Sequence, residues 1–227
     1  MLSPEDLEAL GLTFRLAGTV TLLLLMVCIP MAWWLARTSR RGIRVIVETV
    51  ATLPLVLPPT VLGFYLLLMM GPNGPLGQLF LRLGFDPPVF NFTGLVIGSF
   101  FYSFPFVLQP LQTSFKAVGT LPLEAAATLG AGPIDRLLTV VFPLTRNGIL
   151  TAGVMGFAHT LGEFGVVLML GGNIPGQTRV ASIAIFDHVE QLDYTNAHRL
   201  AGILVLLSFL FLLTVHLLNS PRRRPSP

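Results

Sequence analysis

The chain has 227 residues, of which 53% are hydrophobic and 11% are charged, with a formal net charge of +3. Soluble domains carry about 25% charged residues, so this composition excludes a water-soluble globular domain and predicts an integral membrane protein. The single cysteine, Cys28, excludes a disulfide framework and a cysteine-based metal site.

Five apolar stretches are long enough to cross a bilayer, which takes about 20 predominantly apolar residues per helix. They cover residues 12–36, 45–70, 92–115, 149–170 and 201–218. The second stretch contains Pro54, Pro58 and Pro59, so we expect it to be kinked or broken. The pattern leaves open a sixth, re-entrant piece near residues 180–192. The sequence therefore predicts an all-α fold with about five transmembrane helices in a single domain, residues 1–227.

The basic residues are unevenly distributed among the connections, which predicts an orientation. Most of the 14 Lys and Arg residues lie in the segments 37–44, 116–146 and 222–224. With five spans these three segments fall on one side, which must be the cytoplasm because positively charged loops stay inside. We therefore expect an outside N-terminus, a cytoplasmic C-terminus and a basic, disordered tail over residues 219–227 that is attracted to anionic lipid.

The longest cytoplasmic connection, residues 116–147, has a helical pattern of its own. A first helix is expected to begin after its cap Thr120 and to end at Gly130 in a left-handed conformation. Pro133 is placed to start a second helix, and Pro143 is expected to stop it. These two short, partly apolar helices are either a surface hairpin that links two spans or a docking element for another protein.

One motif in this connection resembles the EAA loop of bacterial ABC importer permeases. The matching positions, in the family's spacing, are Glu124, Ala125, Ala126, Gly130 and Pro143. Val140 and Phe142 stand where the family pattern has isoleucine and leucine, and they preserve its apolar character. The resemblance implies that this loop is the coupling helix, seated in a groove of a cytoplasmic ATPase. Because the chain has no GxxxxGK[ST] phosphate loop, ATP hydrolysis must come from a partner subunit.

Two further stretches, residues 53–67 and 162–186, closely resemble the molybdate permease subunits of such importers. Sulfate permeases are near relatives that diverge around the GNIPG segment, residues 172–176, and a sulfate-type importer is the alternative. The resemblance implies a homodimer of this subunit, two ATP-binding subunits and an external molybdate-binding protein, in the plasma membrane of a bacterium or archaeon. It implies no cofactor, no metal and no nucleic-acid partner. Tungstate is not distinguished from molybdate, because both are tetrahedral dianions of similar size.

Polar residues within the spans are candidates for lining the translocation path. At about 100° per residue, one face of the fourth span carries small residues together with His159, Thr160 and Glu163. His159 and Glu163 are spaced i, i+4 and able to pair. The candidates in the third span are Ser99 and Ser103, with Tyr102, Gln109, Gln112, Thr113 and Ser114 as further ones. Each is either an interhelical hydrogen bond that holds the spans in register or part of the anion path.

Two other functions are compatible with parts of the sequence. An intramembrane hydrolase would use Ser99 or Ser103 as nucleophile and His159 as base, but it leaves the cytoplasmic helices unexplained. A passive anion channel would need neither ATP nor an external binding protein. Proton coupling at Glu163 is a further option, which ATP drive makes unnecessary. The expected function is ATP-driven molybdate import by alternating access.

Overall fold

The computed structural model describes residues 3–219, and all regular elements within this range are helices. In chain order they are α1 (Pro4–Arg37), α2 (Arg41–Thr52), the 3₁₀ turn η1 (Leu53–Leu55), α3 (Pro59–Met70), α4 (Pro75–Arg82), α5 (Phe92–Ala117), α6 (Leu121–Thr128), α7 (Pro133–Arg136), the π-helical turn η2 (Leu137–Val141), α8 (Phe142–Leu161), α9 (Gly165–Gly171), α10 (Ala181–Glu190) and α11 (Tyr194–Asn219). Apart from its first residue, the expected tail 219–227 lies outside the described residues.

Four helical stretches of the described chain are long and apolar enough to cross a membrane, namely α1, α5, the continuous helix Pro133–Leu161 and α11. Two further segments, Arg41–Leu55 and Pro59–Arg82, are long and apolar enough only when taken together, and they are bent by 109° at the break, so they form either a broken fifth span or a re-entrant loop. This bend confirms the expected break at the prolines of the second span. Proline causes such a break because it removes a helical hydrogen bond and clashes with the preceding turn. Helix α10 has ten residues and is too short to cross a bilayer.

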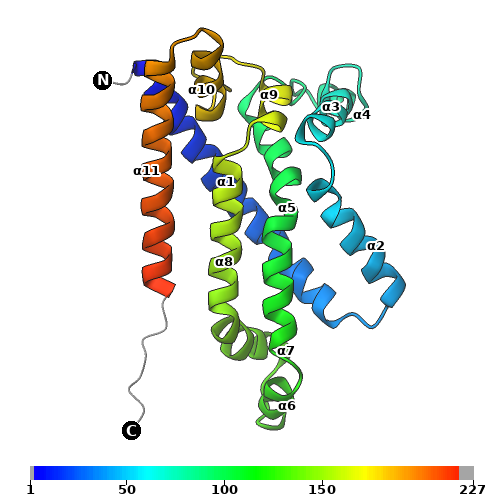
Figure 1. The fold of residues 1–227 in the computed structure, drawn as a ribbon. Helices are drawn as coiled ribbons and strands as arrows, with labels where there is room; N and C mark the ends of the chain where they lie inside the picture. Colours follow the sequence, from blue (N-terminus) through cyan, green and yellow to red (C-terminus); the bar gives the residue numbers. More distant parts are fainter. Residues whose placement is uncertain (1–2, 220–227) are drawn as a thin grey trace.

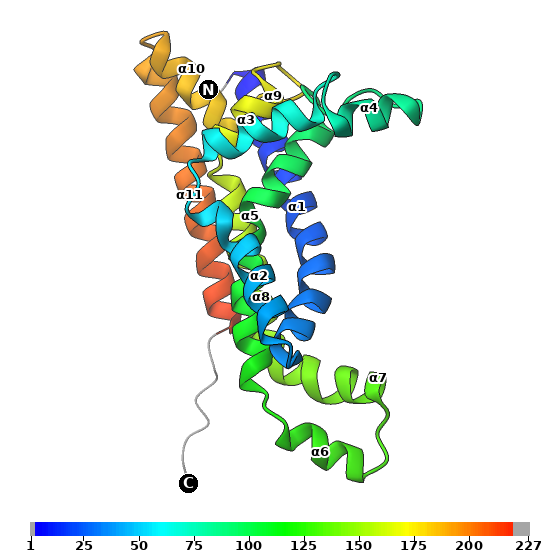
Figure 2. The same ribbon diagram turned by 90° about the vertical axis from the view of Figure 1, so that its right-hand side faces the viewer.

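The helices are arranged with distinct elements at the two ends of the molecule (Figures 1 and 2). Helices α1, α5 and α8 cross at the centre, and α11 runs along one side. Helices α3, α4, α9 and α10 gather at the end where the described chain begins, whereas α6 and α7 lie at the opposite end. The connection between α1 and α2 lies toward the α6 end, so the two basic connections 37–44 and 116–146 lie toward the same end.

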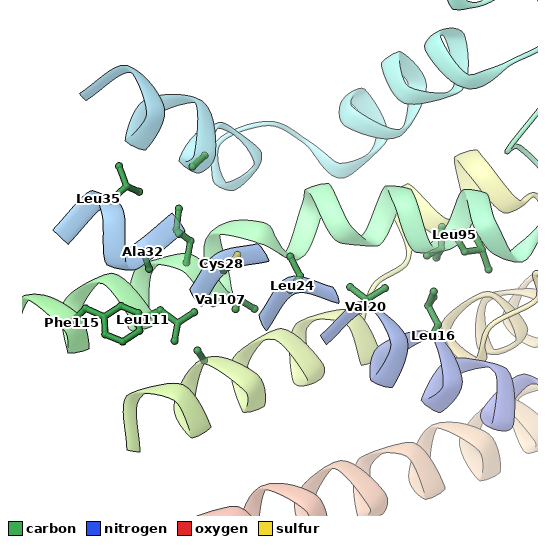
Figure 3. Close-up of a cluster of buried hydrophobic side chains, with 14 of the residues drawn as sticks. Leu16, Val20, Leu24, Cys28, Ala32, Leu35, Leu95, Val107, Leu111 and Phe115 are labelled. Carbon is green, nitrogen blue, oxygen red and sulfur yellow. The ribbon is translucent and has the colours of Figure 1, made fainter. Parts of the chain in front are cut away.

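The core is built from a four-residue repeat along α1. Buried side chains recur at every fourth position of this helix: Leu16, Val20, Leu24, Cys28 and Ala32. This spacing places them on one stripe, which packs against Val107, Leu111 and Phe115 of α5 (Figure 3). Helix α8 approaches α5 closely at Gly156, where an added Cβ would lie 2.5 Å from the Val107 side chain. Small residues permit this approach of the two backbones.

Two helix ends differ from the sequence-based expectation. The fourth span was expected over 149–170, but its helix ends at Leu161 and α9 begins only at Gly165. Glycine at position 162 favours the break, and the freed carbonyl of Glu163 accepts a 2.6 Å hydrogen bond from the Ser182 hydroxyl. The expectation that Pro143 stops a helix was also wrong. Proline is tolerated there because a π-helical turn, residues 137–141, precedes it and the helix continues into α8.

Candidate functional site

The EAA motif lies on a helix that projects from one end of the molecule (Figure 2). Glu124 is exposed in the first turn of α6, close to the positive end of the helix dipole. Leu123 is buried in the main core and holds the helix in place. Leu121 and Leu129 remain 78% and 88% exposed. An anchored helix that presents apolar side chains to the outside is suited to docking against another protein.

The end of α6 has the geometry expected for a glycine stop. Gly130 has a φ of +86°, and its N–H donates to the Ala127 carbonyl, while the Ala131 N–H donates to the Ala126 carbonyl. This pair of hydrogen bonds is the Schellman motif, which favours glycine because a side chain is strained at that φ. Thr120 precedes the helix, but its side chain makes no capping hydrogen bond, so that part of the expectation was wrong.

The polar residues of the third and fourth spans meet at the interface of α5 and α8. Ser103 Oγ lies 2.9 Å from His159 Nδ1 and 2.9 Å from Thr160 Oγ1. The His159 ring stacks on Phe106, with ring centroids 3.7 Å apart, and also contacts Tyr102. Ser103 and Thr160 are buried, so this cluster holds two spans together in an apolar interior.

Glu163 does not pair with His159, contrary to the i, i+4 expectation. The helix ends at Leu161, and Phe164 adopts a φ of −128° and a ψ of −60°, so the regular helical spacing is lost before Glu163. The side chain is 4% exposed, and neither carboxylate oxygen has a hydrogen-bond partner among the described residues. The buried Ser99 hydroxyl of α5 is the side-chain polar group that lies beside the Glu163 carboxylate.

A groove separate from this cluster runs between α5, α8 and η1. Its volume is about 620 Å³, and its polar lining consists of Gln109, Thr113, Ser114 and Thr151. The first three were secondary candidates for the path, whereas Ser99, Ser103, Thr160 and Glu163 are buried away from the surface. Thr151 was missed, although its spacing of three residues from Gly148 and four from Met155 indicates a shared helix face.

Glu48 on α2 is a second polar residue that the sequence pattern did not single out. Its carboxylate accepts a hydrogen bond from Gln112 Nε2 of α5 and lies 3.6 Å from Lys116 Nζ and 3.9 Å from Arg44 Nε. The signal that could have identified it is that it is the only acidic residue in the second apolar stretch. This network ties the first half of the broken span to α5.

At the opposite end, ion pairs and a hydrogen bond hold residues 173–179, α1 and α10 together. Arg179 lies 2.5 Å from Asp187 and 3.2 Å from Glu5, and Asn173 donates to Asp187 over 2.6 Å. His188 Nε2 lies 2.9 Å from Asp6. Within the described chain no group of three or more His, Cys, Asp or Glu residues is placed to hold a metal ion.

The arrangement of Ser103 and His159 is also what a hydrolase would require. The hydroxyl is within hydrogen-bond reach of the imidazole. However, Ser103 is fully buried and shares its oxygen with Thr160, and no carboxylate in the described chain orients His159. A substrate has no access to such a serine, so the geometry favours a structural contact.

Comparisons with known proteins agree with this arrangement. The family model described as "Binding-protein-dependent transport system inner membrane component" matches residues 28–224. The molybdenum transport system permease protein ModB of Azotobacter vinelandii is 58% identical over 215 residues, which cover 95% of each chain. A probable sulfate transport system permease protein of Helicosporidium is 31% identical over 217 residues, 96% of this chain and 80% of that protein.

The fold agrees as well. The crystal structure of a bacterial ABC transporter involved in the import of alginate superposes with a TM-score of 0.81 over 98% of this chain and 81% of that chain, at 16% identity. The exposed EAA helix, the broken spans and the family match over most of the length lead to one assignment. The chain belongs to the family of binding-protein-dependent transport system inner membrane components, as a multi-pass permease subunit and not an enzyme.

Proposed function

We propose that this chain is the permease subunit of an ATP-driven importer of molybdate, which also accepts tungstate. The observation that supports molybdate as the substrate is the 58% identity to a molybdenum permease over 95% of both chains. The sulfate permease of Helicosporidium is 31% identical, so a sulfate-type importer is less well supported. As a family member, the chain works with a binding protein and an ATPase.

The proposed orientation places the N-terminus outside and the α6 end in the cytoplasm. Arg37, Arg40, Arg41 and Arg44 lie in or next to the connection between α1 and α2, which lies toward the same end as α6 (Figures 1 and 2). Positively charged connections remain on the cytoplasmic side of the membrane. The GNIPG segment and α10 then face outward, where the binding protein delivers the anion.

Coupling would run from α6 into the fourth span. We propose that the exposed face around Glu124, Ala125 and Ala126 binds to the ATPase. The loop after Gly130 leads directly into the continuous helix Pro133–Leu161, which carries His159 and Thr160 near its far end. Because a continuous helix transmits rigid-body displacement along its axis, motion of the ATPase would reach the contact between α5 and α8.

The translocation path would form between two copies of the chain. The groove lined by Gln109, Thr113 and Ser114 is open on the subunit surface and offers neutral hydrogen-bond donors. Neutral donors suit a path that must release its anion quickly, because tight binding slows conduction. The cluster of Ser103, His159 and Thr160, behind the groove, would support its wall.

Reconstitution tests the substrate and the energy source together. Vesicles containing the permease and its ATPase, supplied with the binding protein and ATP, should accumulate labelled molybdate. Unlabelled tungstate should compete strongly and sulfate weakly. Uptake without ATP would indicate a passive channel, and equal competition by sulfate would contradict the substrate assignment. Quantifying the subunits of the purified complex tests whether it contains two copies of this chain.

A charge reversal tests the coupling helix. Glu124→Lys should leave membrane insertion intact and abolish ATP-driven uptake, because the exposed α6 face no longer matches its seat on the ATPase. Asp135→Lys is the matched control, since Asp135 is an exposed acid on the neighbouring helix α7. Unchanged uptake in Glu124→Lys, or equal loss in both variants, would contradict the assignment of α6.

A further inference from the structure

The last turns of α1 and α5 enclose a pocket that carries two basic side chains. Its volume is about 270 Å³, and it is lined by Ala36, Arg37, Phe115, Lys116, Gly119 and Thr120. The Arg37 guanidinium lies 3.8 Å from the centroid of the Trp33 ring, a cation–π contact that holds it in place. The Thr120 hydroxyl makes no capping hydrogen bond to α6 and remains a possible donor. The pocket therefore offers two cations and a hydroxyl group to an anion.

The positive charge around this pocket is not balanced by the fold. Arg136 of α7 is near enough to Arg37 for the two positive charges to repel each other. Neither arginine forms an ion pair with a carboxylate among the described residues. Lys116 Nζ lies 3.6 Å from Glu48, but that carboxylate also accepts a hydrogen bond from Gln112. An anion in the pocket would reduce this repulsion between like charges.

Two tryptophans indicate that the pocket lies at the depth of the lipid headgroups. Trp33 and Trp34 are the only tryptophans of the chain, and both lie within four residues of Arg37. Tryptophan is enriched at the interface between the hydrocarbon core and water. Arg37 and Lys116 lie in the last turns of two helices that are long and apolar enough to span the membrane. Basic pockets between spans at this depth bind lipid headgroups.

An apolar cavity close to this pocket has room for part of a fatty-acid chain. It has a volume of about 310 Å³ and lies between α1, α2, η1 and α5, and all its lining residues are apolar. One of them, Val47, directly precedes Glu48, whose carboxylate lies 3.6 Å from Lys116 of the basic pocket. A free phosphate ion would leave this cavity unused. The acyl chain of a bound phospholipid would fill it and contact its walls.

We propose that the pocket between the ends of α1 and α5 binds the phosphate of an anionic phospholipid. Arg37 and Lys116 contact the phosphate oxygens, and the Thr120 hydroxyl donates to one of them. One acyl chain lies in the apolar cavity beside α2. The lipid thereby links the ends of two spans to Thr120, the residue that precedes the coupling helix α6. This site does not depend on which anion the protein transports.

Quenching of tryptophan fluorescence by brominated lipids tests the site. Trp34→Phe leaves Trp33 as the only tryptophan of the chain, and this permease is reconstituted with its ATPase in phosphatidylcholine vesicles. Fluorescence of the ATPase is measured separately and subtracted. Brominated phosphatidylglycerol, an anionic lipid, should bind beside Trp33 about tenfold more strongly than brominated phosphatidylcholine. Equal quenching by the two lipids would overturn the proposal.

Two single-charge variants distinguish a specific pocket from general attraction to a basic surface. Arg37→Gln should lower the preference for phosphatidylglycerol about fivefold, because a cation that contacts the phosphate is removed. Arg40→Gln removes the same charge from a residue that does not line the pocket, and it should retain the preference. Equal losses in both variants would overturn the proposal. If Arg37→Gln does not assemble, Lys116→Gln replaces it with the same expectation.

Competition experiments identify the source of the bound anion. Inorganic phosphate or molybdate, added at constant ionic strength, should leave the quenching unchanged, and displacement of the lipid by either would assign the pocket to a free oxyanion instead. A preference that is present in the permease alone but lost in the complex would assign the pocket to an acidic segment of the ATPase. Labelled molybdate uptake is measured on the same vesicles. Failure of uptake with an intact lipid preference would contradict the proposed function but not this site.

Discussion

The Ser103 hydroxyl lies 2.9 Å from the imidazole Nδ1 of His159, although 56 residues separate them in the chain. The same hydroxyl is 2.9 Å from Thr160 Oγ1, so a single serine of α5 contacts two consecutive residues of α8. In an apolar interior these hydrogen bonds compete with no water. They define how α5 and α8 are rotated against each other.

Ser103→Ala should destabilise the subunit, because it leaves His159 Nδ1 and Thr160 Oγ1 without their shared partner. We expect the free energy of unfolding to fall by about 1–3 kcal/mol, measured as a lower melting temperature in detergent. Ser114→Ala on the same helix is the control, since the Ser114 hydroxyl lines the open groove. Equal effects of the two substitutions would show that the Ser103 contacts contribute nothing.

Gly156→Ala should also lower the melting temperature, because its Cβ would lie 2.5 Å from the Val107 side chain. Overpacking of this kind costs about 1–3 kcal/mol. Gly153→Ala on the same helix places its Cβ 3.5 Å from Leu25, an ordinary contact, and should be neutral or mildly stabilising. A Gly156→Ala subunit as stable as Gly153→Ala would contradict the close α5–α8 packing.

Gly130→Ala should impair assembly with the ATPase rather than membrane insertion. Gly130 has a φ of +86°, and a residue with a side chain is less stable in this conformation than glycine by about 1 kcal/mol or more. The end of α6 would therefore rearrange in the alanine variant. The measurement is the amount of ATPase that co-purifies with the permease. Gly132→Ala should behave as wild type, because Gly132 has a φ of −71° and open space around its Cβ position.

Glu48 and Gln112 should be energetically coupled. Their hydrogen bond joins α2 to α5, so Glu48→Ala and Gln112→Ala should each destabilise the protein, and the double variant should lose less than both effects added. A coupling energy of about 0.5–3 kcal/mol is expected from a double-mutant cycle based on thermal or chemical unfolding. Full additivity would show that this contact does not link the broken span to α5.

Features that depend on neighbouring residues were predictable from the sequence. The five apolar stretches follow from composition over windows of about 20 residues, and the break in the second span follows from its prolines. The glycine stop at Gly130 likewise depends on one backbone position and its flanking helix. These features reflect local sterics and local hydrophobicity, which act over only a few residues.

The fourth span shows where local reasoning failed. A 3.6-residue period carried through residues 149–170 placed Glu163 one turn after His159, but the helix ends at Leu161. The break is stabilised by a hydrogen bond from Ser182, which lies on another helix and 19 residues away. The periodicity of one helix contains no information about a partner on another helix, so the expected pair of His159 and Glu163 was wrong.

The amino-acid sequence by itself determined the membrane class, the apolar stretches and the EAA motif, because each depends on apolar length, proline and glycine positions or motif spacing. Only the tertiary structure decided that His159 bonds to Ser103, that Glu48 bonds to Gln112 and that Glu163 does not pair with His159. The physical reason is that a hydrogen bond requires two groups within about 3.5 Å. Packing of distant helices sets that distance, and spacing along the chain does not.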